Sequence, residues 1–158
     1  MGSGRFPFPL RIYADTSVYG GVFDDKFDVP STKFFSLVDS GEIKLVNSPV
    51  VEKEISTAPQ PVRNFYRDIT FDAETIDSVA EAERLISAYV ANKIISKKWE
   101  TDAAHVALAT VARCDLIASW NFRHLVNLRL IRMYNAVNLL MGYPSLEIRS
   151  PMEVIEID

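Results

Sequence analysis

The chain has 158 residues with 48% hydrophobic and 24% charged side chains, which predicts one domain with a buried core and excludes a disordered polypeptide. Its single cysteine, Cys114, excludes an internal disulfide and a cysteine-based zinc site, and no apolar run approaches the roughly 20 residues that span a bilayer. The net charge of −4 argues against a surface that is basic throughout. We therefore expect a cytoplasmic protein without a membrane partner, in which Cys114 is a small core residue.

The N-terminal region predicts an extension followed by a strand and a helix. Residues 1–10 are interpreted as an N-terminal extension, part of which is compatible with a cloning remnant. The sequence "RIYA" at 11–14 alternates and is rich in β-favouring residues, which indicates a short strand. A helix is expected to begin at Pro30 and to end before Gly41.

The next region predicts a second strand with a helix directly behind it. "IKLVN" at 43–47 is the strand. Ser48 is a suitable N-cap and Pro49 a suitable first helical residue, so a short helix is expected over 50–56. Residues 62–69 predict one or two further helical turns.

The central region predicts two helices and a third strand. Residues 72–96 are rich in alanine and have apolar side chains at helical spacing, so one long helix capped by Asp72 is expected. A second helix is expected over 101–114, capped by Thr101 or a residue close to it. "LIAS" at 116–119 is the strand.

The C-terminal region predicts a helix from Arg123 to about Met141, stopped by Gly142. Residues 146–157 predict a strand-like piece and a turn that begins with proline. The core residues expected on the helix are Leu125, Leu128, Ile131, Val137 and Leu140.

Strands that alternate with helices indicate an α/β fold, and no repeat or linker interrupts the chain. We expect a single domain over residues 11–158, with an α/β/α sandwich around a central parallel sheet of four or five strands.

Several oxygen-bearing side chains follow the predicted strands. In an open α/β sheet, ligands bind at the carboxyl ends of the strands. Asp15 and Asn121 come directly after strands, Glu54 lies in the helix after the second strand, and Asp102 opens a helix. Such carboxylates repel one another unless a cation joins them, and Mg²⁺ or Mn²⁺ prefers oxygen ligands.

Each of these residues also has a purely structural interpretation. Asp15 can cap the following turn, Asp102 suits the first turn of any helix, and Asn121 can form an Asx-type turn. Glu52 and Glu54 point in opposite directions on a helix, so only one of them can face a site.

The neighbouring polar residues receive supporting or structural interpretations. We expect Thr16, Ser17 and Ser119 to hydrogen-bond the carboxylates. His105 is expected to be a partly buried, hydrogen-bonded histidine, and His124 to lie on the surface. Asp115 precedes the third strand, about 13 Å from its other end, and is rejected as a ligand.

Residues 91–132 carry seven basic and three acidic side chains, so this segment is basic within an acidic chain. The charges form either solvated helix faces or a basic rim beside an acidic centre.

Four elements in this order resemble the PIN-domain family of metal-dependent ribonucleases, many of which are toxins of bacterial toxin–antitoxin pairs. "SWNFRHLVN" resembles one subgroup of the family, and the resemblance spans about residues 11–155. The matching elements are Asp15-Thr16-Ser17, Ser48 with Glu54, Asp102-Ala103 with His105, and Ser119-Trp120-Asn121.

The resemblance implies that Asp15, Glu54 and Asp102 hold one or two Mg²⁺ or Mn²⁺ ions and that Asn121 completes the catalytic set. RNA phosphodiester bonds are then hydrolysed, leaving a 5′-phosphate and a 3′-hydroxyl. Many family members have Asp at the position of Asn121, so weaker binding of a second ion is expected here. The residues expected to contact the RNA backbone are Arg123, Lys97 and Lys98.

The resemblance also implies a small antitoxin protein as a partner and a homodimer. The competing interpretation is a PIN-like module that binds RNA or protein without cutting. A haloacid-dehalogenase-like phosphatase is disfavoured because Ser17 stands where that class has a second Asp. A response-regulator receiver is disfavoured because the first strand lacks an acidic pair.

Overall fold

The computed structural model describes residues 7–157, and its centre is an all-parallel sheet. The strand order is β3-β2-β1-β4-β5, and each neighbouring pair is parallel. The predicted α/β fold with a central parallel sheet is therefore confirmed. The strands are β1 (Leu10–Ala14), β2 (Ile43–Asn47), β3 (Glu74–Thr75), β4 (Leu116–Ala118) and β5 (Glu147–Arg149).

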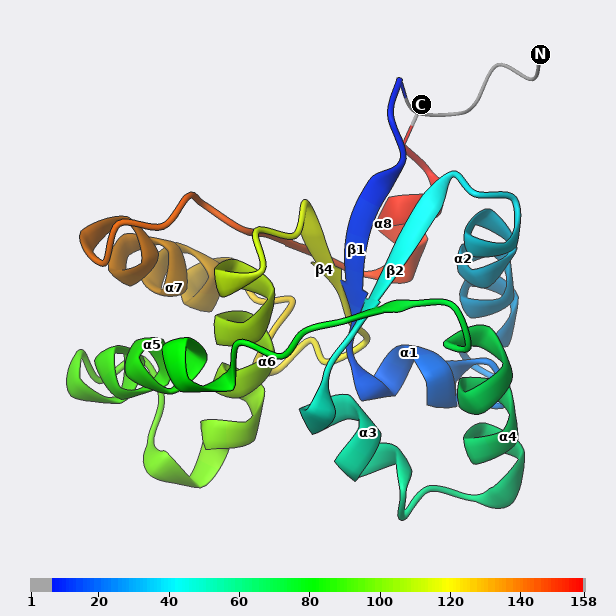
Figure 1. The fold of residues 1–158 in the computed structure, drawn as a ribbon, viewed down its shortest axis with the longest axis horizontal. Coiled ribbons are helices and arrows are strands. Elements are labelled where there is room, and N and C mark those ends of the chain that lie inside the picture. Colours follow the sequence, from blue (N-terminus) through cyan, green and yellow to red (C-terminus); the bar gives the residue numbers. More distant parts are fainter. Residues whose placement is uncertain (1–6, 158) are drawn as a thin grey trace.

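Helices cover both sides of this sheet, with α5, α6 and α7 on one side and α2, α4 and α8 on the other (Figure 1). Helix α1 follows β1 and α3 follows β2, so both begin at the carboxyl edge of the sheet. The helices are α1 (Thr16–Gly21), α2 (Asp28–Asp39), α3 (Pro49–Ile55), α4 (Gln60–Ile69), α5 (Val79–Ala91), α6 (Glu100–Val111), α7 (Leu128–Leu140) and α8 (Pro151–Ile155), and a short 3₁₀ helix, η1, spans Lys97–Trp99.

The central strands are buried because their apolar side chains meet helices on both faces, as is typical of parallel sheets. Ile12, Tyr13 and Ala14 of β1 are fully buried, as are Ile117 and Ala118 of β4. One hydrophobic cluster runs from β1 to α8 and includes Cys114, which confirms the core position expected for this cysteine.

The predicted helix stops at Gly41 and Gly142 and the predicted N-cap at Ser48 are confirmed. Gly41 and Gly142 follow α2 and α7 with φ of +83° and +87°, a conformation that side chains other than glycine rarely adopt. Ser48 caps α3, and its Oγ accepts a hydrogen bond from the Val51 N–H at 3.3 Å.

The long helix predicted over 72–96 is wrong at both ends. Residues 74–75 instead form β3, and the helix begins only at Val79, with Ser78 as its N-cap residue. The helix ends at Ala91 because the chain turns through Lys93, which has a φ of 57°. The prediction that Thr101 caps the next helix is also wrong, since α6 begins at Glu100.

The last long helix begins five residues later than predicted, at Leu128, where the Asn127 side chain accepts a hydrogen bond from the Leu130 N–H. The buried face of the helix also differs from the predicted one. Leu128 and Leu140 are 66% and 80% exposed, so their predicted core positions are wrong. Leu125 and Val137 are buried as expected and Ile131 is partly buried, but the helix turns a different set inward: Leu130, Tyr134, Val137 and Asn138.

Most of the predicted N-terminal extension lies outside the described residues, and β1 begins at Leu10, one residue before its predicted start. Of the helices that residues 7–157 form, none combines the length and apolar character needed to cross a bilayer.

Candidate active site

Asp15 and Ser119 are neighbours because their strands are neighbours. Ala14 of β1 pairs with Ala118 of β4, so the next residue of each strand emerges at the same point of the carboxyl edge. Asp15 is the N-cap of α1 and is only 4% exposed, while Ser119 is fully buried. The Ser119 hydroxyl donates a hydrogen bond of 2.6 Å to Oδ2 of Asp15.

A chain of hydrogen bonds continues from Asp15 to a second carboxylate. The other oxygen of Asp15, Oδ1, accepts from the hydroxyl of Ser17 at 2.5 Å and from its N–H at 3.1 Å. Ser119 Oγ accepts from the Asn121 N–H at 2.9 Å, and Asn121 Nδ2 donates to Oδ1 of Asp102 at 3.4 Å. We call these five residues the Asp15 network: Asp15, Ser17, Ser119, Asn121 and Asp102.

Both carboxylates of the Asp15 network have a raised pKa. Burial raises the pKa of Asp15, although His105 and the two serine hydroxyls act in the opposite direction. Burial also raises the pKa of Asp102, against the influence of His124 and His105. No Lys or Arg of the described residues forms an ion pair with either side chain. Burial therefore disfavours the charged form of both carboxylates, and no Lys or Arg of residues 7–157 compensates for it.

The loop that follows β4 is fixed by Trp120. Its backbone N–H donates to Ser17 Oγ at 2.9 Å, and its ring stacks on Phe27 with 4.2 Å between centroids. The indole Nε1 donates to Ser31 Oγ at 2.9 Å. A Cβ at Gly21 would lie 2.5 Å from this Oγ and 2.8 Å from the indole nitrogen, so the close packing requires glycine.

Glu54 belongs to a second set of hydrogen bonds. Its Oε1 accepts from Thr16 Oγ1 at 2.9 Å and lies 2.6 Å from Nε2 of His105. The other ring nitrogen of His105, Nδ1, lies 2.6 Å from the hydroxyl of Tyr13, which is 2.7 Å from Oγ of Ser48. We call these residues the Glu54 network: Ser48, Tyr13, His105, Glu54 and Thr16.

Proton positions in the Glu54 network follow from the chemistry of its groups. An ionised carboxylate only accepts hydrogen bonds, so the proton between His105 and Glu54 is on Nε2. In a neutral ring Nδ1 then accepts from Tyr13, whose oxygen accepts from Ser48. Partial burial favours a raised pKa for Glu54, but the hydrogen bonds from His105 and Thr16 outweigh burial and lower the pKa. This carboxylate is compensated from within the protein.

The donor chemistry at the carboxyl edge suits a hard cation, although the carboxylates are not gathered into one shell. Asp15 and Asp102 offer oxygen ligands whose charge lacks a counter-ion, which fits Mg²⁺ or Mn²⁺. Glu54 is instead directed to His105. Within residues 7–157, no three His, Cys, Asp or Glu side chains stand close enough together to hold a metal ion.

Comparisons with known proteins do not identify the chain. No protein-family profile matches it, and no curated protein sequence matches it.

Two of the three predicted RNA-contacting residues meet at an aromatic side chain beside the Asp15 network. Lys98 Nζ lies 5.1 Å and Arg123 Cζ 5.8 Å from the ring centroid of Trp99. His124 stacks on the same ring at 4.3 Å between centroids. Lys97 is exposed in the same 3₁₀ helix, η1. Sequence reasoning had not singled out Trp99, and only its position between two basic segments pointed to it.

Other predicted roles are confirmed or corrected by these contacts. His105 is a buried, hydrogen-bonded histidine as expected. His124 is half-buried rather than on the surface, and its Nε2 is buried without a hydrogen-bond partner among the described residues, because the ring packs on Trp99. Asp115 lies at the opposite end of β4, where Oδ2 accepts from the Arg11 N–H at 2.8 Å.

Asn121 has the Asx-type geometry that was its alternative interpretation. Its Oδ1 accepts from the N–H groups of Arg123 at 3.2 Å and His124 at 2.9 Å, so this carbonyl caps a turn. The amide nitrogen is the group that faces Asp102. Ser17 supports Asp15 as expected. Tyr13 is the member of the networks to which the sequence assigned no role at the site.

Proposed function

We propose that this protein is a PIN-like endoribonuclease that uses Mg²⁺ or Mn²⁺ to hydrolyse RNA phosphodiester bonds. The observation that carries the proposal is the buried, uncompensated carboxylate of Asp15, joined through Ser119 and Asn121 to the carboxylate of Asp102. A protein interior rarely retains such charge unless an external cation or a reaction uses it. In this proposal Asp15 and Asp102 hold the cation and Glu54 faces the same reaction centre.

A cation bound there would lower the pKa of a coordinated water and stabilise negative charge on the phosphate. Ser17 and Ser119 fix the rotamer of Asp15, and Asn121 orients Asp102. Glu54 is ionised at neutral pH, and its Oε1 is occupied by His105 and Thr16. Its Oε2 therefore remains to accept a proton from the attacking water. As the P–O3′ bond breaks, the O3′ leaving group takes its proton from a solvent water.

The substrate class follows from the rim beside this centre. Lys98 and Arg123 provide charge for a phosphate backbone, and Trp99 and the half-exposed Phe122 are the neighbouring aromatic side chains. Proteins bind single-stranded nucleic acid with this combination of cations and aromatic rings. Lys97 extends the same basic rim. We therefore propose that the substrate is single-stranded RNA or an unpaired loop of a folded RNA.

The proposal retains the further expectations of the family resemblance. These are a cytoplasmic location, a homodimer and a small antitoxin as partner. The competing function is a PIN-like module that binds RNA or protein without cutting. Two observations favour it: the carbonyl of Asn121 is used by a turn, and the three carboxylates are not gathered into one shell.

A cleavage assay on mixed RNAs separates the two functions. Wild-type protein with Mg²⁺ or Mn²⁺ is expected to produce fragments with 5′-phosphate ends, and EDTA to abolish cleavage. Asp15→Asn is expected to reduce the cleavage rate about 10²- to 10³-fold, as for loss of a group that stabilises transition-state charge. Asp115→Asn is the matched control because it makes the same change at the opposite end of the sheet. Wild-type protein that binds RNA without cutting it in either metal supports the binding module instead.

A further inference from the structure

The outer edge of β2 is only partly covered by its neighbour. Within the described residues, β3 is the strand that lies outside β2, and it pairs only with Val46 and Asn47. The chain reaches β3 through a turn in which the Ala73 N–H donates to the carbonyl of Thr70 at 3.0 Å, so it diverges from β2 before that point. The pairing with β3 therefore starts at the Leu45 carbonyl, and the backbone of β2 before that group has no strand beside it on this side.

The N–H and carbonyl of Ile43 and the N–H of Leu45 face this uncovered side, whereas the Leu45 carbonyl faces Glu74 of β3. The Leu10 N–H of β1 donates to the carbonyl of Glu42, and the Ile76 N–H donates to the carbonyl of Asn47 on the other side of β2. Because peptide groups alternate along a strand, those of Ile43 and Leu45 point away from β1, in the same direction as Asn47. An edge of this kind can pair with another chain.

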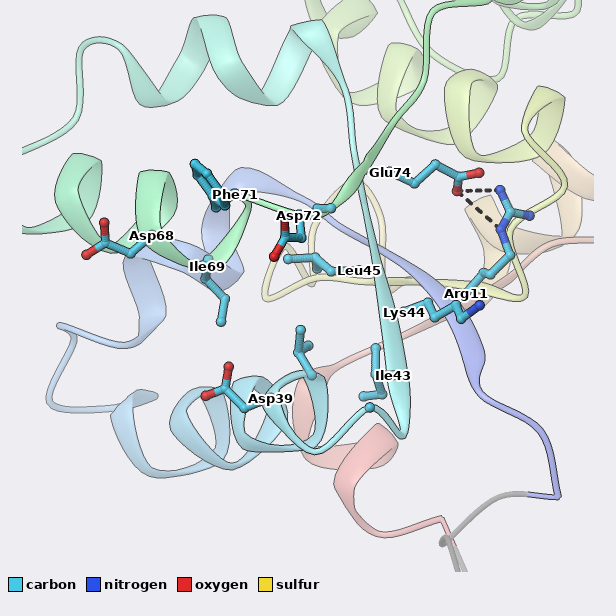
Figure 2. Close-up of a pocket in the computed structure, with 13 residues that line it drawn as sticks. Arg11, Asp39, Ile43, Lys44, Leu45, Asp68, Ile69, Phe71, Asp72 and Glu74 are labelled. Atoms are coloured by element: carbon cyan, nitrogen blue, oxygen red, sulfur yellow. Dashed lines mark hydrogen bonds and ion pairs between the residues drawn. The ribbon is translucent and has the colours of Figure 1, made fainter.

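A cleft of about 640 Å³ lies against this edge, between the ends of α2 and α4 (Figure 2). Ile43 and Leu45 are on its inner side and Ile69 is on the opposing wall. Phe71, at the rim, is 85% exposed. The cleft thus combines unpaired backbone with an apolar floor, which is the arrangement that binds extended peptides by strand addition.

Acidic side chains outnumber basic ones around the cleft. Asp39 and Asp72 line the cleft on either side of its apolar floor. Neither side chain has an ion-pair or hydrogen-bond partner among residues 7–157. Arg11 and Lys44 also line the cleft, and Arg11 is paired with Glu74 at 2.6 Å. With Asp68 and Glu74, the lining has four acidic and two basic side chains, so the cleft favours a basic ligand.

We infer that this cleft, defined by the edge of β2 and by Asp39, Ile69, Phe71 and Asp72, binds an extended segment of a partner protein as an added strand. The segment has an apolar residue for the floor and a basic residue on each side of it. Alternation places three such residues, at i, i+2 and i+4, on one face of the added strand. The inference is independent of RNA cleavage, since the cleft lies at the opposite end of β2 from the proposed centre.

The test uses the folded protein and a synthetic peptide, acetyl-Lys-Thr-Val-Thr-Lys-amide. In the free protein, the N–H groups of Ile43 and Leu45 are expected to exchange with solvent faster than those of Lys44 and Val46, which face β1. Saturation with the peptide is expected to slow exchange at Ile43 and Leu45 by about tenfold or more. Two control peptides are expected not to bind: one with glutamates in place of the lysines, and one N-methylated at its valine and threonines.

A charge-reversal pair tests the position of the peptide. Asp72→Lys is expected to weaken peptide affinity about threefold, the effect typical of an exposed charge pair. Glu83→Lys, at an exposed position of α5, is the control and should leave peptide affinity unchanged. Slow exchange at Ile43 and Leu45 in the free protein, equal binding of the N-methylated peptide, or no binding of the lysine peptide overturns the inference. Protection that appears with protein concentration alone assigns the edge to a second copy of the chain and also overturns it.

Discussion

The Asp15 network and the Glu54 network lie side by side at the carboxyl edge of the sheet, yet the pKa values of Asp15 and Glu54 shift in opposite directions. Burial leaves Asp15 with a raised pKa and without a cationic partner. Glu54 has a lowered pKa because His105 and Thr16 donate hydrogen bonds to it. One carboxylate is destabilised in its charged form by the fold, whereas the other is stabilised in that form.

The difference indicates which network depends on something outside the chain. In the Glu54 network the linked polar groups find their hydrogen-bond partners within the protein. The bonds run from the Val51 N–H through Ser48, Tyr13 and His105 to the carboxylate of Glu54. Such a network rigidifies its surroundings without a ligand. The Asp15 network is ordered by hydroxyl and amide groups, but no Lys or Arg of residues 7–157 pairs with its carboxylates, and the cation that we propose would supply this partner. Substitutions in the two networks should therefore change different properties.

Tyr13→Phe is expected to produce the largest change in stability. It leaves Nδ1 of His105 buried without a partner and removes one partner of Ser48. An unpaired buried polar group costs about 1–3 kcal/mol, so we expect the free energy of unfolding in urea to fall by about 2 kcal/mol. Mn²⁺ affinity, measured by calorimetry, should be unchanged, because the Asp15 network does not include Tyr13.

Tyr143→Phe is the control for this prediction, since its hydroxyl donates to Glu81 near the surface. Its effect on unfolding is expected to stay within about 0.5 kcal/mol. A loss of Mn²⁺ affinity in Tyr13→Phe would show that the two networks act as one unit.

Ser119→Ala tests the Asp15 network. It removes the hydroxyl that fixes Oδ2 of Asp15 and that accepts from the Asn121 N–H. Loss of a group that orients a metal ligand typically lowers metal affinity about 10- to 100-fold, and we expect a decrease of this size for Mn²⁺. Ser40→Ala removes an exposed serine hydroxyl at the end of α2 and should leave the affinity unchanged. Equal affinities of both variants and wild type would mean that Asp15 does not bind the cation.

The strands that position these networks could be predicted from the sequence, because β1, β2 and β4 are short apolar runs bounded by polar residues and helix starts. β3 could not, because its two residues, Glu74 and Thr75, are both exposed and show no alternation. The start of α7 differs from the prediction because Leu125 lies three residues before Leu128, a spacing that continues the helical pattern. Only the capping bond of Asn127 shows where the helix begins.

Only those residues of the candidate site that directly follow strands could be placed from the sequence. Asp15 and Ser119 could be placed together because parallel strands end at one edge. The bond between Tyr13 and His105 joins residues 92 positions apart, and a buried tyrosine inside a strand resembles any core residue. The direction of the Asn121 amide depends on backbone N–H groups, which leave no signal in the residue types.

The smallest expected effect is a pair of opposite pH dependences in metal-free protein. The raised pKa of Asp15 means that its charge opposes folding, so Asp15→Asn should increase the free energy of unfolding at neutral pH. This gain should disappear as the pH falls below 3.8, the unperturbed pKa, where Asp15 is protonated in both states. The lowered pKa of Glu54 means that its charge favours folding, so Glu54→Gln should decrease stability above pH 4.5. That loss should vanish as the pH falls through the lowered pKa. Urea unfolding in EDTA across this range measures both differences, and equal signs for the two variants would contradict the contrast between the networks.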